Sequence, residues 1–155
     1  MDNKNIPETK QYVVFKLGDE DYGIDIQRVT TIERMMLVAR VPKTPDFIKG
    51  VINLRGDIIP VMDLRARFGL PEVTETEETR IVILQMGDIP FGVIVDEVDE
   101  VLQLTDESIE NARNSAANPS LDYVLGMGKI GDRIITLLSV EKLADINQEE
   151  KKQGE

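Results

Sequence analysis

The stretch YVVFKLGDEDYGIDIQRV, residues 12–29, recurs 69 positions later as IVILQMGDIPFGVIVDEV, residues 81–98. Each copy contains an apolar run, a Gly-Asp pair and a second apolar run that alternates, which is the pattern of a β-hairpin. Five of the 18 aligned pairs are identical, and seven more pair two apolar residues. A self-match of this kind indicates one supersecondary unit that is used twice in the chain.

The repeat continues beyond the hairpins at a different offset. The segment GDIIPVMDL, residues 56–64, resembles GDRIITLLSV, residues 131–140, with one extra residue in the turn and an offset of 76 for the apolar positions. Asp63 and Ser139 occupy equivalent places, and both residue types are good helix N-caps. We therefore expect two short helices, over about residues 64–68 and 140–146.

An apolar series with a spacing of three follows each hairpin. The first series is Ile26, Val29 and Ile32, and the second is Val95, Val98 and Val101. This spacing favours a helical or 3₁₀ turn over a strand. Ile26 and Val95 are expected to face the core.

The organisation of the chain is that of one mainly β domain over residues 10–146. It consists of two similar units, at about residues 12–70 and 80–146, and residues 71–79 read as a linker. Residues 105–120 are rich in Asp, Asn, Ser and Ala and form a polar excursion of the second unit. Short strands with Gly-Asp turns predict two small β-barrels rather than a layered α/β sheet. The polar ends, residues 1–9 and 147–155, are expected to be flexible tails.

The composition excludes several kinds of chemistry. The chain has no cysteine and no histidine, so disulfides, thiolate catalysis, histidine catalysis and typical zinc sites are excluded. A metal would need an all-oxygen site of the kind that binds calcium or magnesium. No loop with the spacing of such a site is present, and we expect neither a metal nor a cofactor.

The charge and the hydropathy pattern bear on location and partners. The 18 basic and 29 acidic residues give a net charge of −11, which repels nucleic acid and anionic membranes. No apolar run approaches 18 residues, so no membrane-spanning segment is expected. The N-terminal residues lack an apolar signal core, so secretion is not indicated, and the absence of cysteine suits a reducing cytoplasm. Solubility alone is a sufficient explanation of the charge; attraction of basic protein surfaces is the alternative.

The most distinctive segment is FIKGVINLRGDIIPVMDLR, residues 47–65. On this segment the sequence resembles the CheW family, the coupling proteins of bacterial chemotaxis. The resemblance also rests on the Gly-Asp turns and on the runs YGIDI, residues 22–26, and GVIVD, residues 92–96. It covers about residues 10–146.

The resemblance implies a fold of two five-stranded SH3-like β-barrels packed side by side, with short helices. It implies a non-catalytic adaptor that couples chemoreceptors to a histidine kinase. Members of the family bind the regulatory domain of the kinase CheA and the membrane-distal cytoplasmic tip of chemoreceptors. The expected location is therefore the cytoplasm, with recruitment to membrane receptor arrays and no direct insertion into the membrane.

Two residues of the distinctive segment are candidates for receptor binding. Arg55 lies in a turn from which its planar guanidinium can reach a partner's carboxylate, and the resemblance places it near the receptor cleft. An internal salt bridge that fixes the turn is the alternative. Asn53 interrupts an apolar strand and is expected to bond to local backbone, with a partner contact as the alternative.

The remaining candidates are apolar. Val29, Val98 and Val101 match family segments that contact the receptor and could line a groove for a helical hairpin; core packing is the alternative. For kinase binding the resemblance points to a contact between barrels, to which we assign Ile24 and Val38, although core packing explains these two residues as well.

Two other classes of function remain as alternatives. Small β-barrels often bind nucleic acid or other ligands, but the acidic charge and the few aromatic residues argue against stacking and phosphate contacts. An enzyme that depends on carboxylates would need a paired acid and base in one pocket, and no spacing in the sequence supports one.

Overall fold

The computed structural model describes residues 8–111 and 122–145. The predicted tails fall outside this range except for residues 8 and 9, and so do residues 112–120 of the predicted polar excursion. The described chain forms two β-sheets and two short α-helices, which confirms the prediction of a mainly β fold. Two packed sheets also fit the two predicted SH3-like barrels.

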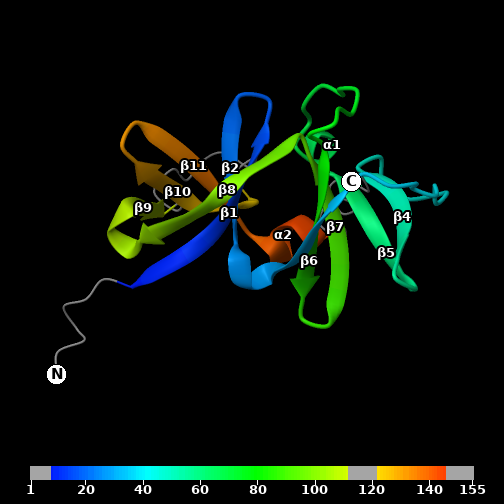
Figure 1. The fold of residues 1–155 in the computed structure, drawn as a ribbon, viewed down its shortest axis with the longest axis horizontal. Helices are drawn as coiled ribbons and strands as arrows, with labels where there is room; N and C mark the ends of the chain where they lie inside the picture. Colours follow the sequence, from blue (N-terminus) through cyan, green and yellow to red (C-terminus); the bar gives the residue numbers. More distant parts are fainter. Residues whose placement is uncertain (1–7, 112–121, 146–155) are drawn as a thin grey trace, which may run out of the picture.

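Sheet A has six strands in the order β8-β1-β2-β11-β10-β9, and sheet B has five in the order β3-β6-β7-β5-β4. The strands of sheet A are β1 (Thr9–Leu17), β2 (Glu20–Asp25), β8 (Glu97–Thr105), β9 (Ile109–Asn111), β10 (Val124–Ile130) and β11 (Arg133–Leu138). Those of sheet B are β3 (Val29–Arg34), β4 (Ile48–Leu54), β5 (Asp57–Asp63), β6 (Arg80–Met86) and β7 (Ile89–Val95). Figure 1 shows the two groups of strands side by side, with α2 between them.

The sheets do not coincide with the two sequence units. The β1–β2 hairpin of the first unit pairs with β8 and β11 of the second, and the β6–β7 hairpin of the second unit pairs with β3 and β5 of the first. Each sheet therefore contains one hairpin from the other half of the chain. The order of equivalent strands is the same in both sheets, and β9 of sheet A corresponds to a single bridge between Ala39 and Val51 in sheet B.

Three apolar clusters hold this arrangement together. One lies within sheet A around Tyr12 and Val14, and a second lies within sheet B around Ile81 and Ile83. The third, which we call the central core, combines residues of both sheets with residues of both helices, among them Leu64 and Leu143. Burial of this apolar surface is the main force that keeps the two sheets together.

The central core explains why β1 and β6 are apolar on both faces. Side chains alternate along a strand, so Tyr12 and Val14 point into one cluster while Phe15 points into the central core. In β6, Ile83 and Leu84 divide in the same way. These runs do not alternate in polarity because both faces are buried, as in the strands of parallel sheets.

Glycine has two uses in the hairpins. Gly18 and Gly87 close the turns with φ values of 62° and 60°, where a side chain would be strained. Gly23 and Gly92 lie inside the sheets, where a Cβ atom would come within 3.1 Å of Ile135 and 2.8 Å of Ile81, respectively. The repeated glycine of the second strand is therefore required by packing.

Both short helices are confirmed, and one of the two predicted turns is wrong. Helices α1 (Leu64–Arg67) and α2 (Val140–Ala144) are capped by the side chains of Asp63 and Ser139. The first spacing-of-three series begins with a 3₁₀ turn, η2 (Ile26–Arg28), and continues as strand β3. The second series contains no helical turn, because β8 begins at Glu97 and stays extended in its pairing with β1.

Candidate interaction surfaces

The turn between β4 and β5 presents Arg55 to solvent. Arg55 has a φ of 53°, which is uncommon for a residue other than glycine, and its side chain is 74% exposed. The nearest carboxylate is that of Glu33, at 3.7 Å from Nη2. Asn53 stabilises the turn, because its Oδ1 accepts a hydrogen bond of 2.9 Å from the amide of Gly56. This bond agrees with the expectation that Asn53 bonds to local backbone.

The three candidate valines lie on two equivalent strands but in different environments. Val29 begins β3 and Val98 lies near the start of β8, and both are partly buried against the central core. Val101 lies further along β8 and is 48% exposed. The approach of Arg55 to Glu33 shows that the side chain of the β4–β5 turn reaches β3, the strand that begins with Val29.

The two residues assigned to kinase binding are placed in or near apolar clusters. Ile24 is fully buried in the central core, in agreement with the alternative of core packing. Val38 is partly buried against the cluster of sheet B. Neither residue belongs to the large apolar side chains that the described residues expose.

Exposed isoleucines occupy equivalent places in the two sheets. Ile58 is the second residue of β5 and Ile134, 76 residues later, is the second residue of β11; their exposed fractions are 63% and 58%. Next to Ile58, an apolar pocket of about 220 Å³ is lined by Pro60, Met62, Ile89 and Phe91, among others. Both sheets therefore expose apolar side chains on equivalent strands, β5 and β11, each of which has a paired strand on both sides.

Ion pairs tie each of the two helices to a segment that connects the two sheets. Arg65 of α1 contacts Asp96 with Nε–Oδ1 at 2.8 Å and Nη2–Oδ2 at 2.6 Å, and the amide of Gly18 donates to Oδ2 at 2.7 Å. These bonds hold the pKa of the Asp96 carboxyl below its usual value, although burial opposes the shift. On the other side, Arg28 pairs with Glu141 of α2 and lowers the pKa of that carboxyl.

Residues 11–148 match the family model described as "CheW-like domain". The chain belongs to the CheW family. It is 42% identical over 134 residues to the chemotaxis protein CheW of Klebsiella aerogenes, which covers 86% of this chain and 81% of that protein. It is 35% identical over 136 residues to the CheW of Bacillus subtilis, covering 88% of this chain and 87% of the relative.

A solved structure shares the CheW fold with this chain. The scaffolding protein TtCheW from Thermoanaerobacter tengcongensis superimposes with a TM-score of 0.84 at 36% identity, over 90% of this chain and 95% of that one. As a member of the CheW family, the chain has a scaffold role in chemotaxis signalling and is not an enzyme. Within the described residues, no three acidic side chains gather closely enough to hold a metal ion. The same residues contain no helix that is long and apolar enough to cross a membrane.

Sequence reasoning missed one buried cation of this CheW-family chain. Arg67 is 6% exposed, and its guanidinium lies 4.2 Å from the ring centre of Phe47 and 4.8 Å from that of Tyr123. Its Nη2 also donates to the carbonyl groups of Lys142 and Asp145 at the end of α2. The sequence offered one signal for this site. Phe47 and Tyr123 are aromatic residues at equivalent positions of the repeat, 76 residues apart.

Proposed function

We propose that this chain couples the cytoplasmic tip of chemoreceptors to the regulatory domain of the histidine kinase CheA, and that it is recruited from the cytoplasm to membrane receptor arrays. Its mechanism is positional: a scaffold that holds two partners together raises the effective concentration of each for the other. The exposed, positive-φ arginine at the β4–β5 turn is the observation that carries the proposal.

Arg55 is suited to contact a partner because the fold has no evident use for its side chain. A residue other than glycine at a φ of 53° costs on the order of 1 kcal/mol, and such costs persist where function requires them. The contact with Glu33 at 3.7 Å is long and exposed, and ion pairs of this kind contribute little stability. The free guanidinium face is available for a carboxylate of the receptor tip.

Val29, Val98 and Val101 extend the same proposed receptor surface. Val101 offers an exposed apolar side chain, whereas Val29 and Val98 support the surface from the central core. A helical hairpin binds through apolar anchors with polar contacts around them, and Arg55 with Asn53 would supply polar contacts of this kind. Asn53 acts by holding the turn.

The kinase contact is proposed at β5 of sheet B, the strand that lies between β7 and β4. Ile58 and the neighbouring apolar pocket offer a surface for a partner barrel, and Ile134 offers a second one on sheet A. Ile24 is buried in the same central core as Met62 and Phe91, which line the pocket, so its role in kinase binding would be to support that surface. Val38 is packed against the apolar cluster of sheet B, and its role in kinase binding would likewise be to support the surface from within.

A two-part experiment tests the proposal. Gel filtration of the chain with CheA at micromolar concentration should give a complex, and the absence of a complex would falsify the kinase part. Co-precipitation with receptor-tip fragments should succeed with the wild type and weaken with Arg55→Ala, while Arg34→Ala on strand β3 serves as the matched control. Equal receptor binding by wild type and a folded Arg55→Ala variant would overturn the assignment of Arg55.

A further inference from the structure

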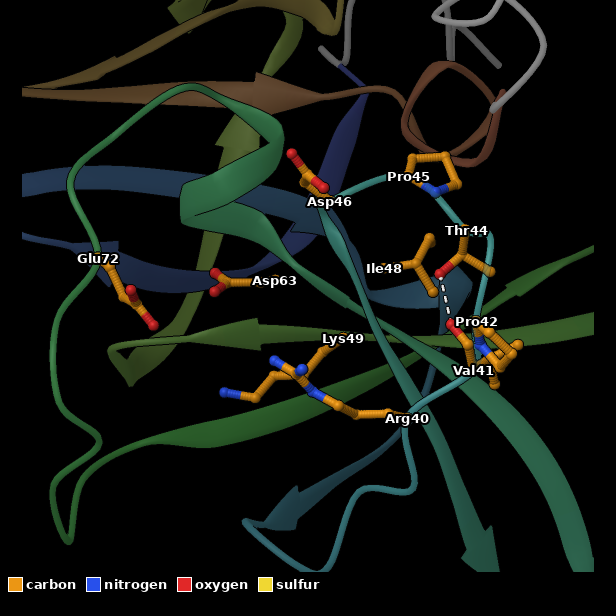
Figure 2. A pocket seen from close by; sticks show the side chains of 10 residues that line it. All are labelled: Arg40, Val41, Pro42, Thr44, Pro45, Asp46, Ile48, Lys49, Asp63 and Glu72. Atoms are coloured by element: carbon orange, nitrogen blue, oxygen red, sulfur yellow. Dashed lines mark hydrogen bonds between the residues drawn. The ribbon is translucent and has the colours of Figure 1, made fainter.

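Figure 2 shows a second concave surface, whose lining contains no residue of the β4–β5 turn. It is a pocket of about 490 Å³, within the range of ligand sites, between the segment that precedes β4 and the segment that follows α1. A smaller pocket of about 220 Å³ shares Lys49, Asp63 and Glu72 with it and continues the same groove. We call the two together the 40–72 groove.

The 40–72 groove contains two cations, Arg40 and Lys49. The antiparallel bridge between Ala39 and Val51 holds the segment of Arg40 beside the start of β4, and both cations line the same pocket. Figure 2 shows both side chains extending toward the side of the groove that holds Asp63 and Glu72. Neither cation makes an ion pair with a residue that the structure describes. The two positive charges are therefore available to an anionic group.

The wall that carries these cations is preorganised. Gly50 has a φ of 152°, and a Cβ atom at this position would lie 2.1 Å from the carbonyl oxygen of Ala39. Only glycine permits this close approach, which fixes the segment against β4. The hydroxyl of Thr44 donates to the carbonyl of Val41 at 3.0 Å, and the amide of Ile48 donates to that of Pro45 at 2.9 Å. A fixed wall reduces the entropy that binding must overcome.

The internal repeat provides a comparison for the basic pair. Gly126 is equivalent to Gly50, and a Cβ atom there would lie 2.5 Å from the carbonyl oxygen of Glu110. The close approach of backbone is thus a common property of both sheets. Lys49, however, corresponds to Leu125, an exposed apolar residue. The fold does not require a cation at this position, so Lys49 has a use that is particular to the first half.

Asp46, Asp63 and Glu72 line the same groove and limit what it can bind. They would repel a ligand that carries several phosphates, and the net charge of −11 adds to this repulsion. A ligand with separate negative and positive groups satisfies both sets of charges. Val41, which also lines the groove, is 38% exposed and adds an apolar contact.

We propose that the 40–72 groove binds a mixed-charge segment of a protein partner, with a carboxylate of that segment between Arg40 and Lys49 and a cation beside Glu72 and Asp46. For its biological use this proposal rests on the proposed scaffold function, to which it adds a contact separate from the Arg55 turn. Its chemistry can be tested on the chain alone.

The test is a nuclear magnetic resonance titration of the full ¹⁵N-labelled chain with four probes. These are the blocked peptides acetyl-AEAKA-amide, acetyl-AEAEA-amide and acetyl-AKAKA-amide, and sodium phosphate. We expect the mixed peptide to shift the amides around Arg40, Lys49 and Glu72 in a saturable way and to bind at least about fivefold more tightly than the other probes. The double variant Arg40→Ala, Lys49→Ala should weaken the mixed peptide about tenfold.

Lys129→Ala, an exposed lysine of sheet A, is the matched control and should bind like the wild type. Unchanged amide positions outside the groove establish that each variant is folded. Equal binding of the mixed peptide and phosphate would overturn the proposal in favour of a simple anion site, and equal binding by wild type and the double variant would overturn it altogether. Because no receptor or kinase is present, these outcomes are independent of the test of the scaffold function.

Discussion

Arg65 and Asp96 form a bidentate ion pair that joins helix α1 to the connection between β7 of sheet B and β8 of sheet A. Arg28 and Glu141 form the corresponding link at α2, with the positions of the two charges exchanged. Arg65 and Glu141 are 76 residues apart and are equivalent in the repeat. Each helix is thus held by an ion pair to a segment that connects the two sheets. The helix supplies the cation at α1 and the anion at α2.

Replacing Asp96 with asparagine should destabilise the fold by about 1–3 kcal/mol, because Arg65 loses its charged partner while the amide of Gly18 keeps an acceptor. Urea unfolding should show a lower midpoint with an unchanged slope. Asp88→Asn, at an exposed turn, is the control and should stay within about 0.5 kcal/mol of the wild type. A midpoint for Asp96→Asn equal to that of the control would contradict this assignment.

Stability should fall in acid in a way that depends on Asp96 and Asp21. Hydrogen bonds from Arg65 lower the pKa of Asp96. Burial raises the pKa of Asp21, but hydrogen bonds from Lys16 and Arg133 outweigh burial, so the pKa of Asp21 is also lowered. Because the folded-state pKa lies below the unfolded one, the unfolded chain binds more protons in acid. The contribution is therefore complete above about pH 5 and is lost as the pH falls through the folded-state pKa.

This dependence is measured as the free energy of unfolding between neutral pH and pH 2, for the wild type and Asp96→Asn. The difference between the two proteins should shrink as the pH falls. A difference that stays constant over the whole range would show that Asp96 does not titrate with a lowered pKa.

Arg67→Ala should cost about 2–4 kcal/mol, because the guanidinium contacts two aromatic rings in a buried site and donates to carbonyl groups at the end of α2. Arg67→Lys keeps the charge but loses the planar fork, so it should recover only part of the loss. Thermal unfolding followed by circular dichroism measures both. If lysine restores full stability, charge alone matters and the planar contacts do not.

Alanine should be tolerated less well at Gly92 than at Gly23. The closest approach of a Cβ atom is 2.8 Å at Gly92, to Ile81, and 3.1 Å at Gly23, to Ile135 and Leu137. Overpacking of this kind typically costs about 1–3 kcal/mol. Melting temperatures of the two variants decide the order, and a lower value for Gly23→Ala would mean that sheet B relaxes more easily than sheet A.

Val98 gives a test of the proposed receptor surface. A larger residue in Val98→Leu should weaken receptor binding more than kinase binding, since the change lies on the receptor side of the proposed scaffold. Val101→Asp, at a position that is 48% exposed, should keep stability within about 0.5 kcal/mol and also weaken receptor binding. Equal losses of receptor and kinase binding by Val98→Leu would point to simple destabilisation of the central core.

The local features of the fold could be predicted from sequence because they depend on neighbouring residues. Gly18 and Gly87 mark the hairpin turns, and Asp63 and Ser139 mark the helix starts. The exchange of hairpins could not be predicted, because the choice between β5 and β11 as a partner for β2 depends on contacts between distant residues. The apolar runs of β1 and β6 fit either pairing.

The candidate sites were predictable to a smaller extent. Asn53 and Arg55 stand out because polar residues interrupt an apolar strand and its turn. Ile24 could not be separated from a surface residue by pattern alone, since its burial depends on the residues of the central core that come from other elements of the chain. Arg67 was missed because its buried contacts come from Phe47 and Tyr123, which are far from it in the chain.

The exchanged hairpins also constrain how the protein is made. Sheet B needs β7, so it is incomplete until Val95 has been synthesised, and sheet A needs β11, which ends at Leu138. A nascent chain that has reached the linker at residues 71–79 therefore carries apolar strands of both sheets and completes neither. Separation of the chain at that linker should yield two fragments that are soluble and structured only when they are expressed together.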